Sequence, residues 1–333
     1  MNEEQETVVV PNWCYDIEVF PNFFSVTFVN IANDTTLVFV IFEEINHLND
    51  LREFVQNHVQ WLIGYNSSKY DDIILRYLLT SEALSFMAPD EITDVIYKMS
   101  VEIIGTQRNG MSLFKIPHLK PYLKDDPSIF ASVDLMSMMY FDKKRISLKK
   151  VAVSMQWPII QDLPKKYNEH VRRSELPEIL KYNKNDVEIT KKLMQEQKDE
   201  LQIRIDVGNL YNLNLMSKSR SSMADLLMAK FWSEETGQKY WDFKDLRTTY
   251  ESIPLSQCLS PKIGFKSPVL KKLHEDIKNT IWTSKTKFEH RVVVNQTAYD
   301  VLLGGLHSLQ PPMVIESDNE YDLIDLDVNI AAS

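Results

Sequence analysis

Three β-rich runs follow one another near the start of the chain, at residues 13–20, 23–31 and 36–42. The connections between them are only two and four residues long and carry the turn residues Pro, Asn and Asp. Parallel neighbours need a crossover of roughly a dozen residues or more, so connections this short permit only antiparallel pairing. The chain is therefore predicted to begin with an antiparallel meander.

The segments after the meander alternate between helical and strand patterns. Residues 43–60 have helical spacing, 61–65 form a buried strand, and a helix begins near Asp71 or Asp72. A further strand is predicted at 130–136, and helices at 147–155 and 176–202. Residues 81–128 are an insertion that we predict to be part helix and part hairpin. This order is compatible with an α/β, ribonuclease-H-like fold, in which helices flank a mixed sheet.

The length of 333 residues predicts about two domains. We place the first over residues 1–205 and the second over residues 206–333, with a boundary near 200–215. The second segment is predicted to be smaller and of α+β type, with helices at 220–235 and 268–280. Strands are predicted there at 289–295, 313–315 and 321–328.

Charge and cysteine content exclude several classes of protein. The 37 Lys and Arg against 47 Asp and Glu leave a net charge of −10, which excludes a uniformly basic nucleic-acid coat but permits a local basic stripe. Two cysteines cannot form a disulfide framework, and no Cys-x-x-Cys pair is present for zinc. The acidic N-terminus does not resemble a signal peptide, and no apolar run approaches the roughly 18–20 residues of a membrane span. We therefore expect a cytoplasmic protein without a membrane partner.

Two acids on the first predicted strand are placed to share one face. Asp16 and Glu18 are two residues apart, so both carboxylates point away from the face that Tyr15, Ile17 and Val19 occupy. Neighbouring carboxylates repel and are costly to bury unless a cation neutralises them. The alternative is an edge strand with a solvated acidic face.

Two further short patterns carry acids. Tyr182 and Asp186 are four residues apart, on one face of the predicted helix at 176–202. Asp71 begins a helix directly after a strand, which is also a position that helices favour for an acid without any function. Together with the strand pair, these acids could converge on two divalent cations suited to attack on a phosphodiester. The Tyr182 hydroxyl would then orient the attacking water.

This set of residues resembles the three exonuclease motifs of DEDD-type 3′–5′ exonucleases of the tyrosine subtype (DEDDy). It is most similar to the proofreading domain of family B DNA polymerases, especially those of bacteriophages, over most of residues 12–200. The segments Asp16–Glu18, Asn66–Asp71 and Tyr182–Asp186 resemble the first, second and third motif. In many phage relatives a Thr that contacts the terminal nucleotide follows the first-motif Glu, where this chain has Val19.

The resemblance implies a nuclease of DNA replication that hydrolyses single-stranded DNA from its 3′ end with two Mg²⁺ or Mn²⁺ ions. A phage-encoded protein of this kind would work in the host cell cytoplasm. The implied catalytic residues are Asp16, Glu18, Asp71, Tyr182 and Asp186, of which the four acids are the implied metal ligands.

A basic stripe at residues 143–173 contains nine Lys or Arg and two acids. We interpret it as a groove that follows the DNA phosphates, with a solvated helix face as the alternative. Within it, Ser147–Val151 resembles the Ser/Thr-Leu-x-x-hydrophobic motif that holds primer ends in protein-primed phage polymerases. By the same resemblance, Asn66 and Tyr70 would face the 3′-terminal nucleotides, with Tyr70 stacking on a base. The predicted DNA-binding residues are Asn66, Tyr70, Ser147, Leu148, Lys149 and Lys150.

Two patterns after residue 300 extend the resemblance toward a polymerase. Residues 303–308 resemble the Tyr-x-Gly-Gly linker between exonuclease and polymerase domains, with Leu303 in place of the aromatic residue, and an ordinary turn is the alternative. Residues 321–329 resemble the strand that carries the first palm carboxylate, here Asp327. The chain is thus similar to the N-terminal portion of a family B polymerase. No residue matches the second palm carboxylate, so DNA synthesis by this chain alone is not expected.

Three functions remain open at this point. The one we predict is a metal-dependent 3′–5′ exonuclease that proofreads DNA. The alternative is a non-catalytic DNA-binding or assembly module that complements a separate polymerase half or other replication proteins. A third is an exonuclease of the same fold that acts on RNA, because the catalytic residues themselves do not select DNA.

Overall fold

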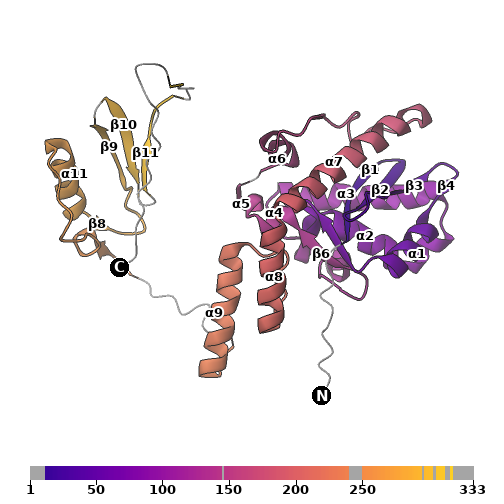
Figure 1. Cartoon of the computed structure of the whole chain (residues 1–333), viewed down its shortest axis with the longest axis horizontal. Coiled ribbons are helices and arrows are strands. Elements are labelled where there is room, and N and C mark those ends of the chain that lie inside the picture. The colour runs from indigo at the N-terminus through magenta and orange to yellow at the C-terminus, as the bar shows by residue number, and fades with distance from the viewer. Residues whose placement is uncertain are drawn as a thin grey trace. The chain divides into compact units, whose positions relative to one another are not determined.

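A computed structural model describes residues 12–144, 146–239, 250–294, 296–302, 305–311 and 316–317. The chain divides into two compact units, Met1–Gln238 and Lys239–Ser333. The first unit contains a sheet with helices packed on it, and Figure 1 shows its elements in their spatial order. Among the described helices, none combines the length and the apolar character that a membrane span requires.

The first unit is built on a six-stranded mixed sheet. Its strands are β1 (Trp13–Phe20), β2 (Phe23–Asn30), β3 (Thr36–Phe42), β4 (Ile45–Asn46), β5 (Trp61–Gly64) and β6 (Ala131–Asp134). They lie in the order β4-β3-β2-β1-β5-β6. The first four pair antiparallel, which confirms the predicted meander, while β1–β5 and β5–β6 pair parallel. A mixed sheet flanked by helices is compatible with a ribonuclease-H-like fold.

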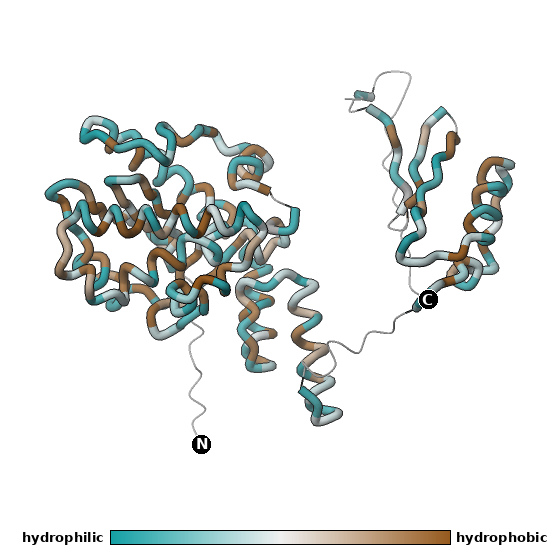
Figure 2. Tube along the Cα trace, turned by 180° about the vertical axis from the view of Figure 1, so that it is seen from behind, coloured by the Kyte–Doolittle hydropathy of each residue, from teal (hydrophilic) through white to brown (hydrophobic). Residues whose placement is uncertain are grey.

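The alternation of β1 side chains divides the core between the two faces of the sheet. Tyr15, Ile17 and Val19 enter a core that α1 (Leu48–His58), α2 (Asp71–Thr80) and α3 (Pro89–Arg108) complete. Cys14 enters a second core with residues of α6 (Leu148–Ser154) and α7 (Leu176–Glu196). α7 packs across β1 and β2, as Figure 1 shows. Asp16 and Glu18 therefore face α7, because they share the orientation of Cys14. Figure 2 shows hydrophobic segments running through the middle of this unit.

The insertion at 81–128 is helical where the sequence analysis expected helix and hairpin. It contains α3 and three short 3₁₀ turns, at Glu82–Phe86, Leu113–Lys115 and Pro117–Tyr122. No strand forms within 81–128, a range that the structure describes in full. The expected hairpin is wrong because Ile92, Ile96, Met99 and Ile103 recur at helical spacing and are buried in the core against β1.

The helix predicted at 176–202 is two helices, because α7 ends at Glu196 and α8 (Lys198–Tyr211) begins after Gln197. α8 and α9 (Arg220–Thr236) belong to the first unit. The fully buried Arg204 of α8 donates hydrogen bonds to the carbonyl of Met138 at 3.4 Å and of Lys218 at 3.0 Å. These hydrogen bonds join α8 to the first unit. The two units divide between residues 238 and 239, and not between 205 and 206 as the sequence predicted.

The described part of the second unit is of α+β type. A three-stranded antiparallel sheet has the order β11-β10-β9, formed by β9 (Glu289–Val294), β10 (Thr297–Leu302) and β11 (Gly305–Ser308). β7 (Ile253–Pro254) pairs with β8 (Ile281–Trp282), and α11 spans Pro268–Lys278. Of the linker-like run at 303–308, the last four residues form β11. Leu303, Gly304, the strands predicted at 313–315 and 321–328, and Asp327 lie outside the described residues.

Candidate active site

Three elements of the first unit bring four acids together, and we call this group the acid cluster. β1 contributes Asp16 and Glu18, the first turn of α2 contributes Asp71, and α7 contributes Asp186. Asp71 is only 7% exposed, and the other three are half-buried. The two acids of β1 stand opposite Thr27 and Ser25 of β2, so neither faces a cation across the strands.

The electrostatics of the acid cluster are those of uncompensated carboxylates. Burial raises the pKa of Asp16 to about 8, and the charge of Asp186 adds to the rise. Burial likewise raises the pKa of Asp186 to about 6. For Glu18 and Asp71, burial again comes first and the charge of Asp16 second, and the pKa of each lies well above its ordinary value. The charges of Asp16 and Asp186 thus disfavour ionisation of neighbouring acids, while the positive charge of Lys149 partly offsets the rise at Asp186.

α7 presents three side chains to the acid cluster, at helical spacing. Tyr182 is 8% exposed, and its hydroxyl hydrogen-bonds to Asp186, which lowers the pKa of that acid. Burial and the charge of Asp186 raise the pKa of Tyr182, so the phenol stays protonated. Asn183 donates from Nδ2 to Oδ2 of Asp16 at 2.8 Å. The structure thus places the predicted residues Asp16, Glu18, Asp71, Tyr182 and Asp186 in one neighbourhood, while their catalytic role stays a prediction.

The loop at 65–70, which leads into Asp71, is fixed at its start by contacts to distant parts of the chain. A Cβ on Gly64 would overlap the Ser67 side chain, so the loop folds back tightly over the end of β5. Asn66 has a φ of 62°, a left-handed conformation that Asn tolerates better than most residues. Its backbone N–H donates to Asp134 at 2.9 Å, and the Tyr65 hydroxyl donates to the carbonyl of Ile146 at 2.7 Å.

The end of the same loop is held by α3. The hydroxyls of Tyr70 and Ser100 lie 2.6 Å apart, and Nε2 of Gln107 donates to the carbonyl of Lys69 at 2.6 Å. Tyr70 is half-buried and packs against the core between the sheet and α1–α3. The charges of Asp71, Glu18 and Asp16 help to raise the pKa of Tyr70, so its hydroxyl lies near the acid cluster. Whether its ring stacks on a base stays a prediction.

Three of the predicted DNA-binding residues line one cavity of about 370 Å³. Its walls are formed by Tyr65, Asn66, Met136, Ile146, Ser147 and Leu148. Ser147 also caps α6, because its hydroxyl accepts a hydrogen bond from the Lys150 N–H at 3.4 Å. Residues 66 and 147–148 are far apart in sequence, and the fold places them side by side.

The basic stripe is partly neutralised by acids. Lys149 pairs with Asp162 at 2.5 Å, Lys165 with Glu175 at 2.8 Å, and Arg173 with Glu43 at 2.8 Å. Within the described part of the stripe, Lys144, Lys150 and Lys166 are exposed and form no ion pair. The positive charge of Lys149 lowers the pKa of Asp186, so this lysine lies near the acid cluster. The stripe is therefore a less uniform cationic surface than its sequence indicates.

The donor chemistry of the acid cluster suits Mg²⁺ or Mn²⁺, since both ions prefer carboxylate oxygen. The raised pKa values fit such a site, because a bound cation would provide the missing counter-charge. In the part of the chain that the structure describes, no three His, Cys, Asp or Glu side chains meet closely enough to hold an ion. The cluster thus has suitable ligands without the convergence of a formed metal centre.

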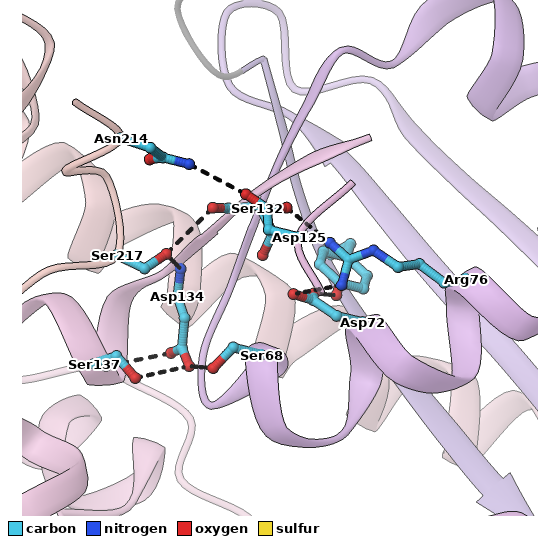
Figure 3. Close-up of polar contacts among 10 residues, drawn as sticks. Ser68, Asp72, Arg76, Asp125, Ser132, Asp134, Ser137, Asn214 and Ser217 are labelled. Carbon is cyan, nitrogen blue, oxygen red and sulfur yellow. Dashed lines mark hydrogen bonds and ion pairs between the residues drawn. The ribbon is translucent and has the colours of Figure 1, made fainter. Parts of the chain in front are cut away.

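A second group of acids, which we call the buried network, lies near the acid cluster and was not predicted. It centres on Asp134 at the end of β6, which is fully buried. The Asp134 carboxylate accepts hydrogen bonds from the Ser68 hydroxyl at 2.5 Å and from the Ser137 hydroxyl at 3.1 Å (Figure 3). It also accepts from the backbone N–H of Asn66 at 2.9 Å. It also caps α4 (Leu135–Met138) by accepting from the N–H of Met136. Asp134 therefore connects β6 to the loop before Asp71.

The rest of the buried network pairs acids with a cation. Asp72 accepts a hydrogen bond from the Tyr15 hydroxyl and lies 3.9 Å from Nη1 of Arg76. Nη2 of Arg76 donates to Asp125 at 2.9 Å (Figure 3). A cavity of about 310 Å³ borders these residues, and Nε of Arg76 and the Ser132 hydroxyl have no partner in the described structure. Ordered water is the simplest partner for such atoms in a polar cavity.

Comparisons with known proteins place few constraints on this chain. No protein-family model matches the sequence. The comparison with curated proteins gives no match. Among solved structures, the chain is similar to Phi29 DNA polymerase in a complex with primer-template DNA and incoming nucleotide substrates, with 14% sequence identity and a TM-score of 0.32. The match covers 57% of this chain and 32% of the polymerase chain, and a likeness at this level assigns neither fold nor function.

Two residues of this region escaped the sequence analysis although local signals were present. Asn183 lies between Tyr182 and Asp186, inside the third motif-like segment. Asp134 lies within the strand predicted at 130–136, but in the structure β6 ends at this residue and α4 follows directly, a position at which acids commonly cap a helix. Neither signal identifies the partner, because Asp16 and Asn66 are distant in sequence.

Proposed function

We propose that this chain is a metal-dependent 3′–5′ exonuclease that hydrolyses single-stranded DNA, as the proofreading part of a family B DNA polymerase. The observation that carries the proposal is the acid cluster itself. Four carboxylates from three elements lie in one neighbourhood with pKa values raised first of all by burial, and Tyr182 lies beside them. A protein without use for a cation there would be more stable with fewer acids.

In the proposed reaction, two bound Mg²⁺ or Mn²⁺ ions would lower the pKa of the attacking water and stabilise the leaving 3′ oxygen. The candidate ligands are Asp16, Glu18, Asp71 and Asp186. The Tyr182 phenol is protonated at neutral pH because its pKa is raised, so it can orient the water by a hydrogen bond but cannot act as a base.

The substrate strand is proposed to enter by the cavity that Asn66, Ser147 and Leu148 line. Its size suits a terminal nucleotide rather than a duplex. Lys150, which is exposed and forms no ion pair in the described structure, would contact phosphate further along the strand.

A second candidate is the non-catalytic DNA-binding or assembly module. The observation that favours it is that no three acids of the described residues meet closely enough to hold an ion. Both candidates bind DNA, so only cleavage separates them.

A digestion assay tests the proposal. Single-stranded DNA and RNA of the same sequence, labelled at the 5′ end, are incubated with Mg²⁺, with Mn²⁺ or with EDTA. We expect stepwise shortening of the DNA from its 3′ end with either metal and none in EDTA. Asp186→Asn is expected to lose this activity, while Tyr182→Phe is expected to be slower by roughly 10²–10³-fold, the effect of one lost orienting donor.

Three outcomes would contradict the proposal. DNA binding without cleavage in either metal favours the non-catalytic module. Faster cleavage of RNA than of DNA assigns the site to RNA. Undiminished cleavage by Asp186→Asn places the activity elsewhere in the chain or in a contaminant.

A further inference from the structure

In the described structure, the side chain of Asn183 joins the acids of β1 to α7 by a hydrogen bond. It is fully buried, one residue after Tyr182 and three before Asp186. Its Nδ2 donates to Oδ2 of Asp16 at 2.8 Å, and a hydrogen bond from the same side chain lowers the pKa of Glu18. One neutral amide therefore reaches both acids of the strand.

The donated bond distinguishes the two oxygens of Asp16. Oδ2 accepts from the amide, and the backbone N–H of Ile17 also donates to this carboxylate, so its orientation is restricted. Side chains that hydrogen-bond to a ligating carboxylate orient it in this way and are needed for tight metal binding.

The other end of the amide gives a second, independent observation. Oδ1 of Asn183 is buried and has no hydrogen-bond partner in the described structure. A leucine at this position would avoid an unpaired buried acceptor, so packing alone does not account for an asparagine here. A serine would be too short to reach both acids, and an aspartate would add a further negative charge to four existing ones.

We propose that Asn183 is a positioning residue, which orients Asp16 and Glu18 of β1 toward a divalent cation shared with Asp186 of α7. This inference rests on the proposed function, because it concerns the cation that the exonuclease would use. Asn183 does not contact the cation or the substrate. It acts by setting the orientation of acids that do.

The test compares Mn²⁺ binding by the wild type, Asn183→Leu and a matched control. Leucine preserves size and removes both polar atoms. The control is Thr190→Val, which also removes a buried polar group from α7, but one that donates to the backbone carbonyl of Asp186 at 3.0 Å. Calorimetry measures the Mn²⁺ dissociation constant, and thermal unfolding in EDTA measures folding. We expect Asn183→Leu to bind Mn²⁺ roughly 10–100-fold more weakly, with Thr190→Val unchanged.

Cleavage kinetics add a readout that a merely structural role would not change. Asn183→Leu is expected to lower kcat while the KM for DNA stays within about twofold, because Asn183 is proposed to act on the metal ligands and not on the substrate. If Asn183→Leu shows no unfolding transition, Asn183→Ala replaces it with the same expectations, since it removes the amide without adding volume.

The outcomes separate this inference from the proposed function. If the wild type cleaves DNA and Asn183→Leu binds Mn²⁺ as tightly as the wild type does, the inference is wrong and the proposed function is unaffected. A wild type that binds Mn²⁺ more than about tenfold tighter than Asn183→Leu, yet cleaves nothing, overturns the proposed function alone. A wild type that binds no Mn²⁺ overturns both.

Discussion

Asp71 and Asp72 are adjacent in the first turn of α2, yet they belong to two different kinds of acidic site. Both are buried, with exposures of 7% and 1%, and burial raises the pKa of both. Asp71 faces the uncompensated charge of Asp16, whereas Asp72 faces the Tyr15 hydroxyl and the Arg76 guanidinium. Burial alone therefore does not distinguish the two acids. They differ in whether a cation or a hydroxyl donor faces the carboxylate.

The two acidic sites also differ in what their loss would do to the fold. In the buried network, each carboxylate satisfies donors that would otherwise be buried without a partner. In the acid cluster, burial and then mutual repulsion disfavour the charged carboxylates, and the Asn183 amide is a compensating donor. Substitutions can separate these roles.

The largest expected effect is on activity, from the double variant Asp16→Asn, Glu18→Gln. We expect cleavage to fall by at least roughly 10⁴-fold, as when a member of a catalytic unit is removed. The melting temperature in EDTA at about pH 8 should nevertheless rise by a few degrees, because the unfolded chain ionises both acids at this pH and the fold disfavours their charged forms, a cost that the amides do not have. A lower melting temperature would show that these acids stabilise the fold and would remove the contrast with the buried network.

Asp134→Ala, in contrast, should chiefly lower the stability of the fold. The change leaves the N–H of Asn66 and two serine hydroxyls without their acceptor, and we expect a loss of about 3 kcal/mol in the free energy of unfolding. That corresponds to a melting temperature lower by roughly 6–12 °C for a unit of this size. The control is Asp162→Ala, an exposed acid paired with Lys149, which should change stability by less than about 1 kcal/mol. Equal effects from the two variants would contradict the role given to Asp134.

A smaller effect is expected in the pH dependence of the metal-free protein. The folded-state pKa values of Asp16 and Asp186 are raised from 3.8 to about 8 and about 6. Between the ordinary and the raised value, the folded protein holds a proton that the unfolded chain has released, so stability must fall as pH rises. Thermal unfolding in EDTA should show this decline from about pH 4 to pH 8, and Asp16→Asn should flatten it above about pH 6. If stability instead increases over this pH range, the pKa values of these acids are not raised in the folded protein.

The smallest effect concerns the basic stripe. The slope of log K for single-stranded DNA against log salt concentration measures how many counterions binding releases. In the double variant Lys149→Ala, Lys150→Ala, this slope should fall in magnitude by about 1, and not by the value of about 2 expected if both lysines contacted phosphate. Of these two lysines, only Lys150 forms no ion pair in the described structure, because Lys149 pairs with Asp162. Binding measured over a series of salt concentrations checks this. An unchanged slope would mean that the stripe is a solvated face.

The parts of the fold that follow from local patterns were predictable from the sequence. The meander follows from two short turns, and the common orientation of Asp16 and Glu18 follows from strand alternation. The helical position of Tyr182 and Asp186 follows in the same way. All these contacts involve residues close in sequence, where backbone geometry leaves few choices.

What could not be predicted depends on pairing between distant segments. The Asn183–Asp16 bond joins residues far apart along the chain, and Asp134 meets Asn66 only because β6 pairs with β5. The break between α7 and α8 was also missed, since Gln197 is compatible with a continuous helix. The expected hairpin within 81–128 was wrong because the burial of α3 against the sheet determines its structure.

The bonds between Ser100 and Tyr70 and from Gln107 to Lys69 limit how far the domain can be shortened. Excision of residues 81–128 would remove the partners of the last two residues before Asp71 and would expose the apolar side of β1 to water. A shortened chain of that kind would need a new helix in the same place. Protein engineers who seek a minimal version should therefore shorten the molecule elsewhere and retain α3 as an integral part of the domain.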